Sequence, residues 1–171
     1  MSLYLAIPAR KHRRAWKEFL RTFGQDGARG FATYGDAKTY GKFLRMHRNY
    51  VLGRRIPKHH VPGSKFFLME EGGAKILGVI DIRHRLNDSL LNRGGHIGYA
   101  VAPDARGKGY ATEMLRLALE ACRGLGIRRA LITCNKENAA SARVIQKSGG
   151  VLEDERTDLE GVIFQRYWIE L

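Results

Sequence analysis

The sequence predicts an α/β fold built on a sheet with mixed strand directions, and three observations support this prediction. The chain has 171 residues, a length that fits a single domain. Hydrophobic residues make up 44% and charged residues 27% of the chain, as in ordinary globular proteins, so a wholly disordered chain is excluded. Two helical segments come first, followed by a hairpin and then by alternating strands and helices, an order typical of α/β sheets.

The first 65 residues predict two helices. Apolar side chains recur at helical spacing between residues 8 and 23 and define the first helix, which is expected to end at Gly24. Asp36 is expected to cap a second helix that runs over residues 36–52. Prolines interrupt residues 53–63, which are therefore expected to be irregular. The apolar positions of the first helix are Ala15, Trp16, Phe19, Leu20 and Phe23.

From residue 66 onward, short apolar runs alternate with turns and amphipathic segments. The turn at residues 71–73 joins the first two runs into a hairpin. The run 129–134 is mostly apolar, as expected for a strand buried on both faces. The expected elements in chain order are strands 66–69, 75–82 and 95–101, helix 112–124, strand 129–134, helix 138–148, and strands 151–156 and 162–169.

The positive charge of the chain is concentrated in its first third. The formal net charge is +13. Residues 1–65 hold 15 lysines and arginines against three acidic residues, whereas residues 66–171 hold 15 against 14. A basic region of this kind attracts nucleic acid, anionic lipid, or a phosphorylated cofactor or substrate. A basic surface without a specific partner explains the same charge.

Several classes of protein are excluded by the composition. No apolar run approaches the roughly 20 residues that span a bilayer. The first residues lack the basic region and the long apolar stretch of a secretory signal. The two cysteines, Cys122 and Cys134, have neither metal-binding nor redox spacing. We therefore expect a cytoplasmic protein without a metal site, a disulfide scaffold or a membrane partner.

The segment 101–112 (V-A-P-D-A-R-G-K-G-Y-A-T) predicts an anion-binding loop. A strand ends here, and a loop with two glycines leads directly into a helix whose N-terminal N–H groups favour phosphate. The glycines allow close backbone approach, and Arg106 and Lys108 add positive charge. The Walker pattern is absent, and the dinucleotide pattern lacks both its third glycine and its downstream acid. The loop is therefore expected to bind another diphosphate, with an ordinary glycine turn as the alternative.

Two motifs together resemble the GNAT superfamily of N-acetyltransferases. Arg106-x-x-Gly109-x-Ala111 is similar to its acetyl-CoA signature, and residues 138–150 resemble a second stretch of that family about 30 residues downstream. The sequence G-G-H-I-G-Y-A-V resembles a bacterial branch of unassigned acceptor. The resemblance implies a mostly antiparallel central sheet flanked by about four helices. It also implies a single domain over 1–171, with an acetyl-CoA-binding body at 66–171 and a basic helical acceptor-side region at 1–65.

The resemblance also implies which residues bind acetyl-CoA. In such proteins the loop holds the diphosphate, and the preceding strand pairs with the pantetheine arm. The backbone N–H of Val101 is expected to polarise the thioester carbonyl. As an alternative, Asn138 acts only as a helix N-cap. The expected cofactor-binding residues are Tyr99, Val101, Arg106, Gly107, Lys108, Gly109, Tyr110, Ala111, Thr112, Asn138 and Ser141.

His96 is the expected general base, because it occupies the position where many relatives carry a glutamate. An ordinary histidine has a pKa near neutrality and can accept the proton of an amine. A bulge at Gly98 would turn His96 to the other face, and a purely structural histidine is the alternative. Asp81 and His84 are alternative bases. Ile145 occupies the position of a tyrosine that protonates the leaving thiolate in many relatives, so water or Ser141 would have to do so here.

The resemblance predicts an enzyme that moves an acetyl group from acetyl-CoA to an unidentified amine, either a small molecule or the N-terminus or a lysine of a protein. The alternative function is a non-catalytic module that senses acyl-CoA or binds nucleic acid or ribosomes through the basic region. Aromatic residues interleaved with its cations would then stack on bases, although their helical spacing favours a core position. A homodimer paired through the terminal strand is a further expectation. The interleaved aromatic residues are Trp16, Phe19, Tyr40, Phe43 and Tyr50.

Overall fold

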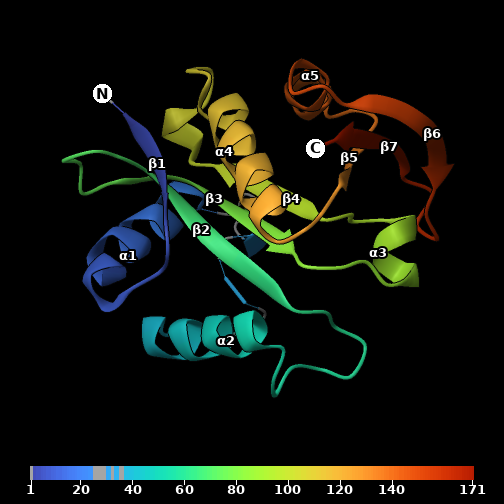
Figure 1. The fold of residues 1–171 in the computed structure, drawn as a ribbon. Helices are drawn as coiled ribbons and strands as arrows, with labels where there is room; N and C mark the ends of the chain where they lie inside the picture. The colour runs from blue at the N-terminus through green and yellow to red at the C-terminus, as the bar shows by residue number, and fades with distance from the viewer. Residues whose placement is uncertain (1, 25–29, 32, 35–36) are drawn as a thin grey trace.

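A computed structural model describes residues 2–24, 30–31, 33–34 and 37–171 of the chain, and its strands form two antiparallel sheets (Figure 1). The first sheet has the order β1-β2-β3-β4, and the second has the order β5-β7-β6. The first sheet comprises β1 (Leu3–Ala6), β2 (Gly63–Glu70), β3 (Ile76–Arg83) and β4 (Ile97–Val101). The second comprises β5 (Arg129–Asn135), β6 (Val151–Thr157) and β7 (Ile163–Glu170).

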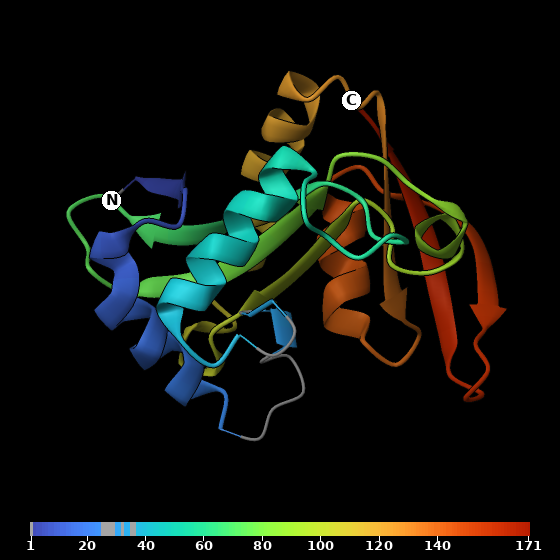
Figure 2. The same cartoon turned by 90° about the horizontal axis from the view of Figure 1, so that it is seen from below.

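Helices cover both faces of the first sheet. In Figure 1, α1 (Arg13–Thr22) and α2 (Tyr40–Leu52) lie below it, and α4 (Tyr110–Gly124) lies above it. The short helix α3 (Asp88–Asn92) follows β3, and α5 (Ala139–Lys147) lies beside the second sheet. Seen from below, α2 crosses the first sheet while α5 lies alongside β5, at the junction between the sheets (Figure 2).

The two sheets touch at one end of β4. The backbone N–H of His96 donates to the carbonyl of Leu131 at 2.7 Å, and Gly95 forms an isolated antiparallel bridge with Ile132. Gly95 has a φ of +65°, and a Cβ there would lie 2.2 Å from the Leu131 carbonyl oxygen. Only glycine fits this close approach. No ladder continues the pairing between β4 and β5 among the described residues, so backbone pairing between the two sheets is limited to this short stretch.

An aromatic cluster attaches the two N-terminal helices to the first sheet. Phe43 of α2 stacks on Phe67 of β2 with ring centroids 5.9 Å apart, and Trp16 of α1 packs on Phe43 at 5.5 Å. Each of these side chains is at most 2% exposed. Burying a large apolar side chain contributes on the order of 1.5–3 kcal/mol, so this cluster fixes the position of α1 and α2 over β2.

The α/β fold with mostly antiparallel strands is confirmed, although the strands divide into two sheets instead of one. Two elements were not predicted, the edge strand β1 and the helix α3. The first helix was predicted to begin too early, because residues 10–12 form a 3-10 turn before α1. The predicted cap Asp36 lies outside the described residues, and Thr39 caps α2 by accepting from the Lys42 N–H at 3.2 Å.

The helix after the glycine loop also begins earlier than predicted. It starts at Tyr110, so Tyr110 and Ala111 form its first turn instead of the end of the loop. Gly109 is the N-cap, with a φ of +80°. Across the described residues, no helix combines the length and apolar character needed to cross a membrane.

Candidate functional site

A cavity of about 950 Å³ lies where β4 and β5 separate; we call it the first cavity. Its walls are β4, β5, α5 and the glycine loop that leads into α4. Three of these segments, β4, the glycine loop and α5, were assigned to one ligand from the sequence, and β5 was expected only as a buried strand. The predicted binding residues in its lining are Tyr99, Val101, Arg106, Gly107, Gly109, Tyr110, Ala111, Thr112, Asn138 and Ser141. Lys108 is exposed and is not part of this lining.

Both ends of β4 are hydrogen-bonded to β3. The carbonyl of His96, just before β4, accepts from the Arg83 N–H at 2.7 Å. Just after β4, the Ala102 N–H donates to the Leu77 carbonyl at 2.9 Å. The backbone N–H and C=O groups of successive strand residues point in alternating directions. Between these two points, the backbone groups of Gly98 and Ala100 therefore also point toward β3.

The intervening β4 residues direct their backbone N–H and C=O groups away from β3. These residues are Ile97, Tyr99 and Val101, and all three line the first cavity. One of these carbonyls, that of Val101, accepts from Arg106 Nε at 3.3 Å. An extended ligand can therefore hydrogen-bond along this edge as an added strand would.

The N-terminus of α4 closes one end of the first cavity. The first N–H groups of a helix have no intrahelical acceptor, and they carry a partial positive charge. Gly107 and Gly109 have φ values of +77° and +80°, and a Cβ at either position would meet no atom within 4 Å. Space is therefore open beside these backbone groups, as an anion that approaches them requires.

Helix α5 contributes polar groups from the opposite wall. Asn138 caps α5, since its Oδ1 accepts from the Ser141 N–H at 3.1 Å, and it also lines the first cavity. Its capping role is therefore observed, and its contact with a ligand stays a prediction. Arg143 and Lys147 of the same helix also line the cavity. Together with Arg106 they place cations around the glycine loop.

Two hydroxyl groups meet inside the first cavity. Tyr99 Oη of β4 and Ser141 Oγ of α5 are 2.8 Å apart. Burial raises the pKa of Tyr99 to about 12, and its hydrogen bond with Ser141 only partly opposes that increase. The Tyr99 phenol therefore keeps its proton at neutral pH, and the pair can donate a proton to a group in the cavity.

His96 is held against β5. Its Nδ1 accepts from the Leu131 backbone N–H at 3.0 Å, and the side chain is 8% exposed. Burial, and then the positive charge of Arg83, lower the pKa of His96 to about 4. With Nδ1 occupied, the neutral ring carries its proton on Nε2 and has no lone pair left for an amine proton. His96 does not line either described cavity. Its role as base stays a prediction, and this arrangement favours a structural one.

The structure shows no bulge at Gly98; the irregular backbone lies just before β4. Gly98 pairs with Asp81 in a regular register, and the positive φ values occur before the strand, at Gly94 and Gly95. His84, one alternative base, shares a hydrogen bond of 2.8 Å with Ser64 through its Nε2. Burial lowers the pKa of His84.

Ile145 is completely buried and lies outside the lining of the first cavity. The preceding residue, Val144, reaches the cavity instead. Ile145 packs under the chain reversal after α5, because a Cβ on Gly150 would lie 2.5 Å from Ile145 Cγ2. It has a packing role in this fold.

A second cavity, of about 880 Å³, lies between α2, β3 and the segments around residues 58–61 and 85–90. The two cavities share Arg83. Its guanidinium lies beside Gly98 of β4, since a Cβ on Gly98 would be 3.3 Å from Arg83 Nη1 and 2.9 Å from Phe31 Cε1. The missing side chain at Gly98 thus lets Phe31 and Arg83 lie close against β4, where the linings of the two cavities share Arg83.

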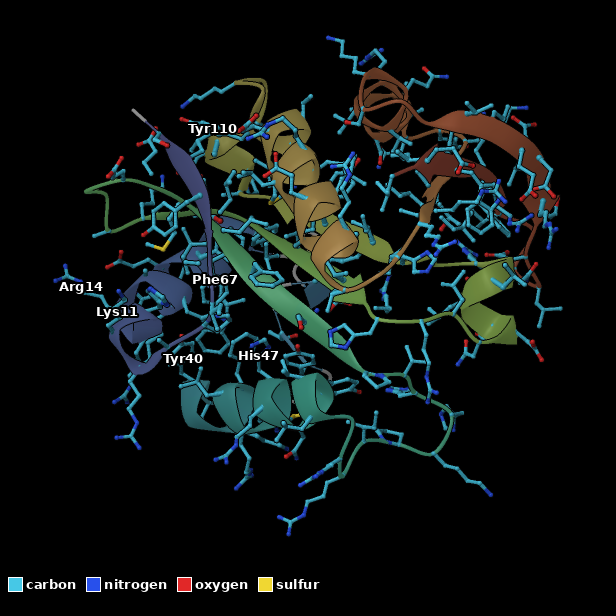
Figure 3. The ribbon with its side chains drawn as sticks, in the orientation of Figure 1. Lys11, Arg14, Tyr40, His47, Phe67 and Tyr110 are labelled. Atoms are coloured by element: carbon cyan, nitrogen blue, oxygen red, sulfur yellow. The ribbon has the colours of Figure 1, made fainter. Side chains whose placement is uncertain are left out.

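The aromatic residues of the basic region pack into the core. Trp16, Phe19, Tyr40 and Phe43 are buried, so they form no stacking surface for bases (Figure 3, where Tyr40 is labelled). Tyr50 is partly buried against Tyr34, with centroids 4.8 Å apart. The cations around them are exposed, as Lys11 and Arg14 show in Figure 3. Binding of nucleic acid through these charges stays a prediction.

Sequence reasoning missed several lining residues of the first cavity. Phe31, Arg83, Arg93 and Arg143 come from four different segments of the chain. Arg143 lies within the motif at residues 138–150, whereas the other three belong to no motif and are brought to the cavity only by the tertiary structure. Among the described residues, no cluster of three or more histidines, cysteines or acidic residues is arranged to hold a metal ion.

Comparisons with known proteins agree with this geometry. Residues 13–151 match the family model described as acetyltransferase (GNAT) domain. A comparison with curated proteins finds no match. The structure resembles RimL, a ribosomal L7/L12 α-N-protein acetyltransferase solved with coenzyme A. The TM-score is 0.73 at 17% identity, covering 100% of this chain and 95% of that one.

Two further solved structures show the same fold. One is the microcin C7 self immunity acetyltransferase MccE in complex with acetyl-CoA and AMP. Its TM-score is 0.66 at 18% identity, covering 99% of this chain and 92% of that one. The other is a mutant of the spermidine N-acetyltransferase SpeG from Vibrio cholerae. Its TM-score is 0.65 at 13% identity, covering 99% of this chain and 95% of that one.

Proposed function

Because this chain belongs to the acetyltransferase (GNAT) domain family, we propose that it transfers the acetyl group of acetyl-CoA to the nitrogen of an amine. The first cavity receives acetyl-CoA, and the second cavity receives the acceptor. The structures of RimL with coenzyme A and of MccE with acetyl-CoA support the choice of this substrate.

The observation that carries the proposal is the position of the β4 edge relative to the N-terminus of α4. The backbone groups of Tyr99 and Val101 border the same cavity as Gly107 and Gly109. A ligand with an extended amide-containing arm and a diphosphate fits this pair of features. The arm hydrogen-bonds to the strand edge, and the diphosphate accepts from the amides at the start of α4.

The reaction consists of one bond exchange. Acetyl-CoA supplies a thioester; the acceptor nitrogen bonds to its carbonyl carbon, the C–S bond breaks, and coenzyme A leaves as a thiolate. Within this scheme the Val101 N–H stabilises the negative charge that develops on the carbonyl oxygen. The acceptor must lose a proton, which passes to water at the junction of the two cavities, since His96 has no lone pair available for it.

The Tyr99–Ser141 pair protonates the leaving thiolate. It takes the role that a tyrosine at the position of Ile145 has in many relatives. The observations that support it are the 2.8 Å contact of the two hydroxyls, their place in the cavity lining, and the raised pKa of Tyr99. Ser141 gives its hydroxyl proton to the thiolate as it takes one from water, and Tyr99 holds the serine hydroxyl in position.

Two assays test the proposed function. Acetyl-CoA is expected to raise the melting temperature, because a ligand that binds only the folded state at about 100 times its Kd adds roughly 2.7 kcal/mol of stability. With a primary amine present, free coenzyme A thiol is expected to appear over time. The control nucleotide is NADPH, which is expected to give no stabilisation. An unchanged melting temperature at millimolar acetyl-CoA would contradict the proposal.

A further inference from the structure

The second cavity has a positive lining. Among the described residues, four cations and two carboxylates line it. Burial lowers the pKa of Lys65, which reduces the positive charge that it contributes. Without Lys65, three cations still face two carboxylates. The charged lining residues are Lys58, Lys65, Asp81, Arg83, Arg85 and Asp88.

The carboxylate deepest in this cavity is already neutralised. Asp81 lies 3.1 Å from Arg83 Nε and 3.5 Å from Lys65 Nζ, and its side chain is 14% exposed. The Arg83 guanidinium alone balances the charge of this carboxylate, which therefore attracts an ammonium group only weakly. The other carboxylate, Asp88, is exposed at the start of α3.

Two of the cations have no partner among the described residues. Arg85 and Lys58 are exposed and form no ion pair or hydrogen bond with the part of the chain that the structure describes. Lys58 belongs to the segment after α2 and Arg85 to the segment after β3, and Asn87 Nδ2 joins these two segments by donating to the His59 carbonyl at 2.8 Å. Both are therefore available to a charged group on an incoming molecule.

We infer that the acceptor is a primary amine that carries a carboxylate or phosphate group, which Arg85 and Lys58 bind while the amine reaches Gly98. This inference rests on the proposed function and specifies its substrate class. A cationic polyamine of the kind named for SpeG is the opposite class. Carboxylate and phosphate share the required negative charge, and the experiment distinguishes them.

The same charges favour the reactive form of the amine. A positive environment destabilises an ammonium group relative to the neutral amine, and only the neutral amine attacks a carbonyl carbon. The anionic group on the acceptor supplies the binding energy that its ammonium group cannot. Arg83 beside Gly98 is ion-paired with Asp81, so the unpaired outer cations Lys58 and Arg85 supply both the binding and the positive field in this cavity.

The experiment measures kcat/KM for matched amine pairs with saturating acetyl-CoA. Phosphoethanolamine is compared with ethanolamine, and the C-terminally amidated peptide Ala-Asp-Asp with amidated Ala-Asn-Asn. The cationic amine is 1,3-diaminopropane. At least one anionic amine is expected to exceed its neutral partner about tenfold, a magnitude typical of partly solvated charge pairs. A preference within the phosphate pair alone identifies phosphate, and one within the peptide pair alone identifies carboxylate.

A charge reversal at the cavity mouth provides the second readout. Arg85→Glu is expected to lower kcat/KM for the preferred anionic amine about tenfold or more, with little change for its neutral partner. The matched control is Arg45→Glu, which makes the same change of net charge at an exposed α2 residue outside the lining. Arg45→Glu is expected to leave the preference unchanged. If both variants lower kcat/KM for the anionic amine equally, the preference comes from the net positive charge of the protein and not from Arg85. That result would overturn the inference.

The remaining outcomes separate this inference from the proposed function. If acetyl-CoA binds and the neutral or cationic amines react as well as the anionic ones, the inference is wrong while the proposed function holds. If no amine reacts, calorimetry measures how tightly the protein loaded with coenzyme A binds each amine of the same pairs. Equal affinities for an anionic amine and its neutral partner, in both pairs, would overturn the inference. Failure of acetyl-CoA to bind at all would remove the proposed function itself.

Discussion

Tyr99 Oη and Ser141 Oγ lie 2.8 Å apart, so a hydrogen bond joins β4 to α5 inside the first cavity. The two residues are separated by 42 positions in the chain and belong to different motifs. Their contact crosses the gap between the two sheets, at the place where the proposed reaction would release a thiolate. In the proposed mechanism this pair is the proton donor, since Ile145 is buried away from the cavity.

Removal of either hydroxyl is expected to slow the reaction more than it weakens binding. General acid catalysis contributes about 10²–10⁴-fold, and water can replace part of it, so Ser141→Ala is expected to lower kcat about 10- to 100-fold. Tyr99→Phe is expected to lower kcat by a smaller factor, because the Tyr99 hydroxyl only holds Ser141 in position. Calorimetry with coenzyme A is expected to show similar affinities for both variants. A normal kcat for Ser141→Ala would remove the pair from the mechanism.

Gly109 is expected to be required for both the helix start and ligand binding. Gly109→Ala places a Cβ at a φ of +80°, which costs about 1–2 kcal/mol of folding stability, and it obstructs the approach of an anion. The matched control is Gly161→Ala, at a φ of +82° in the turn between β6 and β7, also with open space around its Cβ. Denaturation is expected to show similar losses for both variants. Only Gly109→Ala is expected to weaken acetyl-CoA binding, and equal affinities would contradict the site.

Enlarging Gly98 is expected to block the passage between the cavities. A Cβ at this position already approaches the ends of Phe31 and Arg83, and its backbone is regular, so Gly98→Val fills the junction while the strand persists. The expected result is a loss of amine acetylation of about 100-fold or more, with acetyl-CoA still bound, because near-attack geometry contributes that much. Parallel kinetic and calorimetric measurements separate the two effects. Normal kinetics with Gly98→Val would place the acceptor elsewhere.

His96 is expected to make folding stability depend on pH. Its ordinary pKa of 6.5 is lowered to about 4 in the folded protein. Between these values the unfolded chain binds the proton and the folded one does not, so stability present above pH 6.5 is lost as the pH falls toward 4. The linkage amounts to about 2–3 kcal/mol. His96→Gln is expected to reduce this pH dependence in denaturation experiments from pH 4 to 7.

The same variant tests the alternative role of His96. If the side chain only supports the contact between the two sheets, His96→Gln changes kcat by no more than a few-fold at pH 7.5 in protein that remains folded. A loss of 100-fold or more, together with the disappearance of the acidic limb of the kcat/KM profile, would restore His96 as the general base.

The central part of the fold could be predicted because its signals are local. The strand, glycine loop and helix around residues 101–112 follow from turn residues and apolar spacing, and the structure shows each of them. Asn138 shows both the capping contact and the cavity position that the sequence suggested. Gly126, just after α4, and Gly161, between β6 and β7, have positive φ values, which favour glycine at a helix end or in a turn.

The missed elements depend on partners distant in the sequence. The strand β1 has four residues and exists through its pairing with the far end of β2, where Leu3 lies opposite Glu70. No local pattern predicts such an edge strand. The orientation of His96 depends on a Leu131 backbone group 35 residues away and on the close approach at Gly95. The second cavity is likewise assembled from α2, β3 and two loops, and no motif marks it.

The most direct test is a crystal structure of the protein with acetyl-CoA. The diphosphate is expected at the backbone amides of residues 107–112, and the pantetheine arm along the edge of Tyr99 and Val101, with the thioester near Gly98. Density for the ligand at another surface, with the space between β4 and β5 filled by protein side chains, would contradict the assignment of the first cavity and the reaction built on it.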